Sequence, residues 1–151
     1  LIMGGGNDWS SAERWIEQSD TLKFLKDPAN NLAFEAHVYF DKDASGTYKY
    51  SYEEEECYPE KGIDRVKPFV EWIKQNKFHG FIGEYGIPDN DPRWNETLDL
   101  FLGYLQENGI NGTYWAAGPW WDTYFMAITP KDGKDRPQMP IIEKYTSTLK
   151  K

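Results

Sequence analysis

The segment Gly80-Phe81-Ile82-Gly83-Glu84-Tyr85-Gly86 is more informative about the fold of this chain than any other. Its apolar residues indicate a buried strand, which ends in one carboxylate and then breaks at glycine. A Glu at the end of a buried strand, followed by a loop that contains Pro and Asp, has the position of catalytic groups in barrel enzymes. Taken alone, the segment is equally compatible with an ordinary strand-end carboxylate, so its neighbours have to decide.

Strands and helices alternate along the chain around this segment. Strands are predicted at 1–4, 32–39, around Phe81 and at 110–115. Helices are predicted from Ser10 or Ser11 through Gln18, at 63–73, from the Asp91-Pro92 N-cap to Gly109, and from Pro140 to about Leu149. Because a helix separates each strand from the next and the longer polar loops follow strands, this order predicts parallel β/α units of the barrel type.

The composition excludes several classes of partner. With a net charge of -8 the chain lacks the clustered Lys and Arg that a phosphate backbone requires, so no nucleic-acid partner is expected. No run of about 18 apolar residues is present, so no membrane partner is expected either. Aromatic residues make up 17% of the chain, and flat rings suit stacking on sugar rings. Cys57 is the only cysteine, which rules out an intrachain disulfide.

The first residues, Leu1-Ile2-Met3-Gly4-Gly5-Gly6, have neither the charged region nor the long apolar core of a signal peptide. They look more like the end of a strand than the start of a protein. We therefore expect a fragment or a processed chain.

The predicted strand ends carry side chains suited to one shared site. The first end has Asn7-Asp8-Trp9, the second His37 and Tyr39, the third Glu84 and Tyr85, and the fourth Trp115 with Trp120 and Trp121. In a barrel these groups would converge on one pocket with a carboxylate, an imidazole, a phenol and indoles, which suits a polyhydroxylated substrate. Individually, His37 as a core histidine and Trp115 as plain core packing are credible alternatives, but jointly the site is favoured.

A possible metal loop is better explained as a turn. Asp41-Lys42-Asp43-Ala44-Ser45-Gly46 is similar to the start of a calcium loop, but Tyr52 stands where a bidentate Glu is required. We therefore expect no metal site there.

Four motifs resemble glycoside hydrolase family 5 endoglucanases, in the same order and spacing. They are Met3 to Ser10 for the fifth strand, His37-Val38-Tyr39-Phe40-Asp41 with Asp43 and Ser45-Gly46-Thr47 for the sixth, 80–86 for the seventh-strand nucleophile motif, and Thr113 to Trp121 for the eighth. Val38 departs from the polar residue that relatives often carry. The resemblance implies an α/β fold in which residues 1–151 form one unit, the half of a TIM (β/α)8 barrel that contains strands five to eight.

The resemblance also implies a function, that of a secreted endo-β-1,4-glucanase acting by a retaining mechanism without metal or cofactor. Glu84 would be the nucleophile, Tyr39 would hydrogen-bond to it, and His37 would contact the sugar or the surroundings of Glu84. The implied substrate-binding residues are Trp115 as the stacking platform, and Asn7, Trp9, Trp120 and Trp121 with lesser support. Two alternatives stay open: a silent half-barrel that binds β-glucan through its aromatic rim, and a folding fragment without a selected function.

The expected acid/base Glu, which follows an Asn at the end of the fourth strand in this family, has no counterpart in this chain. Asn95-Glu96 is the wrong context, because it lies on a predicted helix. A half-barrel would also expose two strand edges, so a partner is expected. Either a complementing N-terminal half or a second copy related by a two-fold axis would close the barrel, the latter making a homo-oligomer with opposed Glu84 residues.

Overall fold

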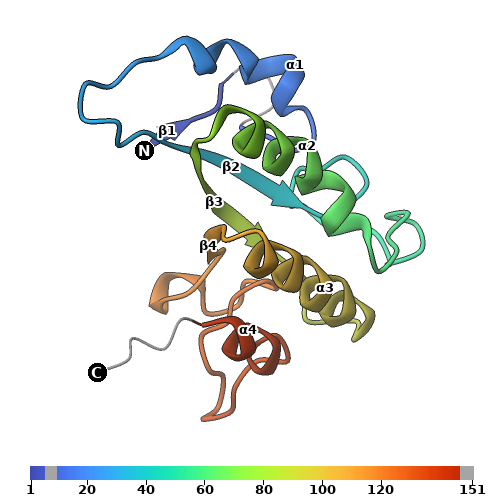
Figure 1. Ribbon diagram of the computed structural model, residues 1–151. Helices are drawn as coiled ribbons and strands as arrows, with labels where there is room; N and C mark the ends of the chain where they lie inside the picture. Colours follow the sequence, from blue (N-terminus) through green and yellow to red (C-terminus); the bar gives the residue numbers. More distant parts are fainter. Residues whose placement is uncertain (6–9, 147–151) are drawn as a thin grey trace.

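The computed structural model describes residues 1–5 and 10–146. Within these residues, β1 (Ile2–Met3), β2 (Ala33–Tyr39), β3 (His79–Gly86) and β4 (Asn111–Tyr114) form one sheet in the order β1-β2-β3-β4 (Figure 1). Every neighbouring pair is parallel. The predicted strands and their parallel arrangement are therefore confirmed, and all four carboxyl ends meet at one edge of the sheet.

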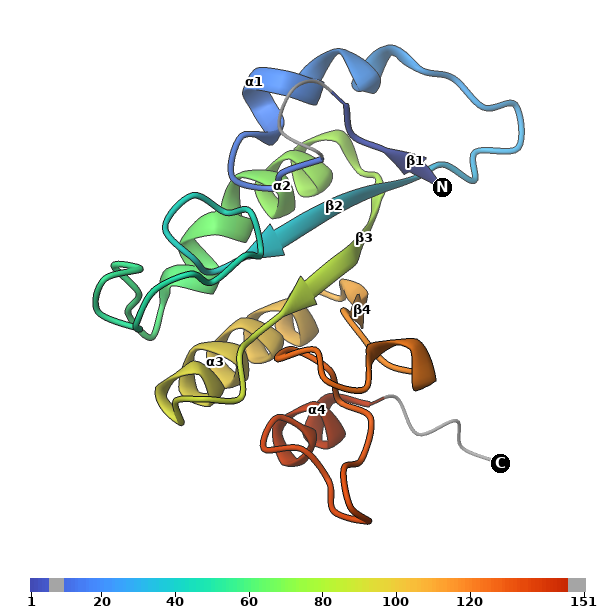
Figure 2. The same cartoon turned by 180° about the vertical axis from the view of Figure 1, so that it is seen from behind.

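The α-helices form a single layer against this sheet. The helical segments of the described residues are α1 (Trp15–Ser19), the 3-10 helix η1 (Asp20–Phe24), α2 (Lys61–Asn76), α3 (Arg93–Glu107), the 3-10 helix η2 (Pro119–Trp121) and α4 (Met139–Tyr145). α1 packs against α2, α2 against α3, and α3 against α4. Helices α2 and α3 lie in front of the central strands in Figure 1 and behind them in Figure 2. The fold is thus a parallel α/β fold with helices on one face.

The core fills the space between the strands and the helix layer. Alternate residues of β2 are fully or almost fully buried on that side, and the apolar stripes of α2 and α3 cover them. Aromatic rings dominate the contact: Trp15 meets Trp72 with ring centroids 5.3 Å apart, and Phe34 meets Trp72 at 5.1 Å. Edge-on contacts of this kind add to the free energy gained from burying the rings.

The start of the first helix differs from the sequence prediction. Ser10 and Ser11 do not cap it, because α1 begins only at Trp15. The backbone of Ser10 has a φ of 66°, and its hydroxyl donates to the carbonyl of Glu35 at 2.7 Å. The serine therefore joins the loop to β2. At α3 the predicted cap is nearly right, since the Asp91 carboxylate accepts the backbone N–H of Arg93 at 2.9 Å.

The segment after β2 is a turn, as the sequence predicts. Asp41 is completely buried, and its carboxylate accepts the backbone N–H groups of Gly46 and Thr47 at 3.1 and 3.0 Å. These bonds close the loop on itself at the carboxyl end of the strand. The buried Arg65 guanidinium adds bonds to the carbonyls of Tyr39 and Lys42. The loop is therefore tied to both β2 and α2.

Candidate catalytic site

An irregularity in β3 places the central carboxylate of the site. The pairing of β2 with β3 is regular up to Ala36 opposite Ile82, but His37 then lies opposite Glu84. Gly83 is thus an extra residue, a β-bulge that re-aims the side chains after it. In a regular strand, Glu84 would share the helix-facing side with the fully buried Ile82. The bulge turns Glu84 to the opposite face, beside His37.

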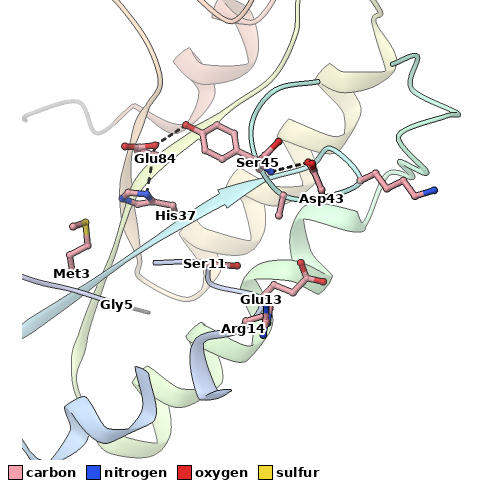
Figure 3. Close-up of a pocket in the computed structure, with 13 residues that line it drawn as sticks. Met3, Gly5, Ser11, Glu13, Arg14, His37, Asp43, Ser45 and Glu84 are labelled. Carbon is pink, nitrogen blue, oxygen red and sulfur yellow. Dashed lines mark hydrogen bonds and ion pairs between the residues drawn. The ribbon is translucent and has the colours of Figure 1, made fainter. Parts of the chain in front are cut away.

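Two side chains of β2 contact the Glu84 carboxylate. The Tyr39 hydroxyl donates to Glu84 Oε2 at 2.9 Å, and His37 Nδ1 lies 3.6 Å from the same oxygen (Figure 3). The side chain of Glu84 is 30% exposed and that of His37 is 16% exposed. The structure therefore brings the three predicted catalytic residues together, with the carboxylate still open to solvent.

The phenol of Tyr39 is held in its neutral form. Burial raises its pKa well above the ordinary value, and the charge and hydrogen bond of Glu84 raise it further. A neutral phenol keeps its proton and donates a hydrogen bond to the carboxylate, and such a bond stabilises the charged state of the acceptor. Tyr39 is accordingly a hydrogen-bond donor to Glu84 throughout the neutral pH range.

A cleft of about 1000 Å³ runs from these three residues over the ends of β1 and β2. Its far side is polar and includes Glu13, Arg14, Lys42, Asp43 and Ser45 (Figure 3). The site thus opens into a groove large enough for a ligand of several rings. Many charged and hydroxyl groups line it, which suits a ligand rich in hydroxyls.

Three of the predicted tryptophans follow β4, outside the lining of that cleft. The backbone N–H of Trp115 donates to the carbonyl of Tyr85 at 2.8 Å, which attaches it to β3. Its ring meets Trp121 with centroids 5.1 Å apart, and Trp121 meets Tyr124 at 5.0 Å. The side chain of Trp120 is 92% exposed. Trp115 and Trp121 therefore form one aromatic cluster, while Trp120 projects into solvent.

The remaining two predicted site residues, Asn7 and Trp9, lie outside the residues that the structure describes. A further residue, Glu35, was missed by the sequence analysis: its Oε1 lies 3.2 Å from His37 Nε2. The available signal was the alternation of polar and apolar residues in Glu35-Ala36-His37-Val38-Tyr39, which puts Glu35 on the same face as His37.

Within residues 1–5 and 10–146, no group of three or more His, Cys, Asp or Glu side chains is placed to hold a metal ion. None of the helices there has the length and apolar character that crossing a membrane requires.

The chain is similar to known cellulose-degrading enzymes. Residues 1–120 match the family described as Cellulase (glycosyl hydrolase family 5). The probable endo-β-1,4-glucanase B of Aspergillus kawachii is 37% identical over 145 residues, which cover 93% of this chain and 42% of that protein. The chain therefore spans less than half the length of this relative.

Solved structures give the same result. The endoglucanase Cel5A of Pseudomonas stutzeri superposes with a TM-score of 0.85 and 42% identity, covering 97% of this chain and 44% of that one. The same enzyme in complex with cellobiose superposes with a TM-score of 0.85 and 44% identity, covering 95% and 43%. Both comparisons match this chain to under half of the longer protein.

Proposed function

Since the chain belongs to glycosyl hydrolase family 5, we propose that it carries the nucleophile half of an endo-β-1,4-glucanase, with Glu84 as the nucleophile. The observation that supports this most is the pair of contacts to Glu84 Oε2 from Tyr39 and His37. A carboxylate attacks best when it is charged, accessible and fixed in direction. Glu84 accepts a hydrogen bond from Tyr39 on one side, lies beside the His37 ring on the other, and is open toward the cleft.

The proposed reaction retains the anomeric configuration through two displacements. In the first, a Glu84 oxygen forms a bond to the anomeric carbon while the bond to the leaving sugar oxygen breaks, and an acid protonates that oxygen. In the second, water attacks the anomeric carbon, gives its proton to the conjugate base of that acid, and releases Glu84. The hydrogen bond from Tyr39 holds Glu84 in place for the first step.

The acid in this proposal comes from outside the chain. Among the described residues, the cleft contains two other carboxylates, and neither suits proton donation. The Ser45 hydroxyl lowers the pKa of Asp43, which makes that group a poor acid. Glu13 forms an ion pair with Arg65, with Oε2 and Nε 3.3 Å apart. Glu35 is absent from the cleft lining.

We propose that a complementing half-barrel supplies the acid and closes the sheet at β1 and β4. A half with strands one to four of a relative fits this role, because the matched relatives are more than twice as long as the part they share with this chain. In this proposal residues 1–151 are the C-terminal half of one TIM-barrel domain. A second copy of the chain is the competing partner. Light scattering of the chain alone separates the two, since only self-pairing gives a dimer there.

The proposed substrate is a β-1,4-glucan, bound along the cleft and the aromatic cluster. Trp115 is the proposed platform for the sugar that reacts, since it follows β4 at the same sheet edge as Glu84. Trp120 and Trp121, with Asn7 and Trp9, are proposed for the outer sugars. No metal or cofactor takes part in this reaction scheme. Because polymeric glucan does not enter cells, the proposal includes secretion.

A second candidate function is glucan binding without catalysis. The observation that favours it is the exposure of Trp120, a large apolar ring offered to solvent as stacking platforms are. It predicts retention of the chain on cellulose with no chemical step at Glu84.

A test that does not depend on the acid separates these functions. A dinitrophenyl fluoro-β-cellobioside has a leaving group that departs without protonation, and its fluorine slows hydrolysis of the glycosyl-enzyme. The chain, alone and mixed with an N-terminal half of a relative, is incubated with this reagent and weighed intact by mass spectrometry. We expect a mass increase of one fluorocellobiosyl group, located on Glu84 by peptide mapping.

The matched control is Glu84→Gln, which keeps the size of the side chain and should take up no label. A label on another carboxylate, or equal labelling of the variant, would exclude Glu84 as the nucleophile. With the complementing half present, soluble carboxymethyl-cellulose should be hydrolysed by wild type and not by Glu84→Ala. Binding to cellulose without labelling, both for the chain alone and with the complementing half present, would favour the binding function.

A further inference from the structure

Glu35 is a largely buried carboxylate that the proposed reaction does not use. Its side chain is 20% exposed, and it lies two residues before His37 on the same face of β2. Glu35 Oε1 accepts a hydrogen bond at 3.2 Å from His37 Nε2. Among residues 1–5 and 10–146, no lysine or arginine forms an ion pair with it. Among the described residues, the His37 imidazole is therefore the side chain that pairs with the Glu35 carboxylate.

The bulge residue Gly83 makes room for this carboxylate. A Cβ built on Gly83 would lie 1.8 Å from Glu35 Oε1 and 2.5 Å from Glu35 Cδ. Real Cβ atoms do not approach other atoms so closely, so an alanine there would displace the carboxylate. The bulge thus has two effects: it turns Glu84 toward His37, and it leaves space for Glu35 behind the same ring.

His37 lies between two carboxylates as a result. Nε2 faces Glu35 and Nδ1 faces Glu84, at 3.2 and 3.6 Å. A carboxylate only accepts hydrogen bonds, so the nitrogen that faces Glu35 has to carry a proton. This contact selects the tautomer and the orientation of the ring, as the partners of functional histidines commonly do.

We propose that Glu35 is a positioning residue, which with the space at Gly83 fixes the His37 ring so that Nδ1 is presented to the nucleophile. Glu35 itself does not touch substrate, because the cleft is lined by His37, Tyr39 and Glu84 but not by Glu35. The orientation of the ring stands independently of catalysis. Only its effect on rate rests on the proposed function.

The chain offers a direct measurement, because it contains only two histidines. The second, His79, is exposed at the start of β3 and serves as an internal control. Long-range proton–nitrogen NMR spectra of histidine-labelled chain report which ring nitrogen carries the proton. In wild type we expect His37 always to carry a proton on Nε2. In Glu35→Ala we expect signals shifted toward a tautomer mixture, with those of His79 unchanged.

Gly83→Ala tests the role of the bulge through a double-mutant cycle. Alone, it should change the His37 signals in the same direction as Glu35→Ala. Combined with Glu35→Ala, it should add little, because the clashing carboxylate is gone. Unchanged His37 signals in Glu35→Ala, or full additivity of the two substitutions, would overturn the proposal. Urea titration of each variant shows whether a spectral change follows from unfolding instead.

The catalytic consequence is measured as the rate of Glu84 labelling. We expect Glu35→Ala to slow labelling about tenfold at saturating reagent, which is the usual scale for a residue behind a reacting group. The reagent concentration that gives half-saturation should change little. Glu35→Gln retains an acceptor and should recover part of the rate. Altered NMR signals in a chain that takes up no label would sustain the positioning role while refuting the proposed function. Normal labelling in Glu35→Ala would confine Glu35 to a structural role and contradict the proposal.

Discussion

The two faces of β2 have different tasks. Facing the helices, Phe34 and Ala36 are completely buried and Val38 is 3% exposed. On the other face, Glu35 and His37 are polar, partly exposed and hydrogen-bonded to each other. Because side chains alternate along a strand, core residues and proposed site residues are interleaved in seven residues without sharing a position. Substitutions on one face should therefore leave the property of the other nearly intact.

The largest effect is expected on the reaction rate, from a substitution on the polar face of the sheet. Glu84→Gln should slow glycosyl transfer by about 10⁴-fold or more, the scale seen when a nucleophile is removed. The free energy of unfolding of the Glu84→Gln variant should differ from that of wild type by less than about 1 kcal/mol, because the Glu84 side chain is 30% exposed. Label uptake and urea unfolding of the same sample measure both values. A large loss of stability would show that the two faces are coupled.

The reverse pattern is expected for Phe34→Ala on the helix side. The ring is completely buried against Trp72 and Phe78, so its removal should lower the free energy of unfolding by about 3–5 kcal/mol. The labelling rate per folded molecule should stay within a few-fold of wild type. Phe24→Ala is the matched control, because Phe24 is 72% exposed and should cost under about 0.5 kcal/mol.

Tyr39→Phe should have an intermediate effect on the rate. It removes the 2.9 Å hydrogen bond to Glu84 but keeps the ring. Hydrogen bonds to charged groups contribute about 1.5–3 kcal/mol, so labelling should slow by roughly 10- to 100-fold. A rate equal to wild type would mean that the bond does not act on the nucleophile.

Ionisation of the helix-facing Tyr85 should contribute to the pH dependence of the free energy of unfolding. Its ring packs on Phe101 with centroids 5.4 Å apart, and burial raises the pKa of its phenol to about 12. The unfolded phenol ionises near pH 10, so stability should be constant below about pH 9 and fall as the pH rises from 10 toward 12. Between pH 8 and 11, wild type should lose about 1 kcal/mol more than Tyr85→Phe in urea titrations. Equal losses would contradict the burial of this phenol.

The smallest effect is expected from Trp120→Ala. With 92% of the side chain exposed, its removal should change stability by less than about 0.5 kcal/mol. Retention on cellulose should weaken by about 1 kcal/mol if the ring stacks on sugar. Unchanged retention would remove Trp120 from the proposed outer sites.

The sequence predicts the strands and helices well but not the register in which the strands pair. Hydrophobic periodicity locates the strands and helices, and their alternation predicts the parallel sheet. The meeting of His37, Tyr39 and Glu84 follows from their places at strand ends. Strict alternation from Ile82 puts Glu84 on the wrong face, however, and only the extra residue Gly83 corrects this. Pairing between strands is set by tertiary contacts, which a single sequence does not reveal.

The same limit explains the other differences. Ser10 and Ser11 have the residue type of helix caps, but the bond from Ser10 to the carbonyl of Glu35 competes with capping. Glu35 was missed because a polar residue in an alternating strand usually faces water, and nothing in one sequence shows that the imidazole two residues on covers it.

The extra residue in β3 also has a consequence for protein engineering. If Gly83 were instead paired in a regular ladder, opposite His37, every residue after it would exchange inside for outside. The Glu84 carboxylate would then point toward the helix layer although no contact residue had been altered. Anyone who grafts this strand onto another parallel sheet has to transfer the bulge together with the side chains.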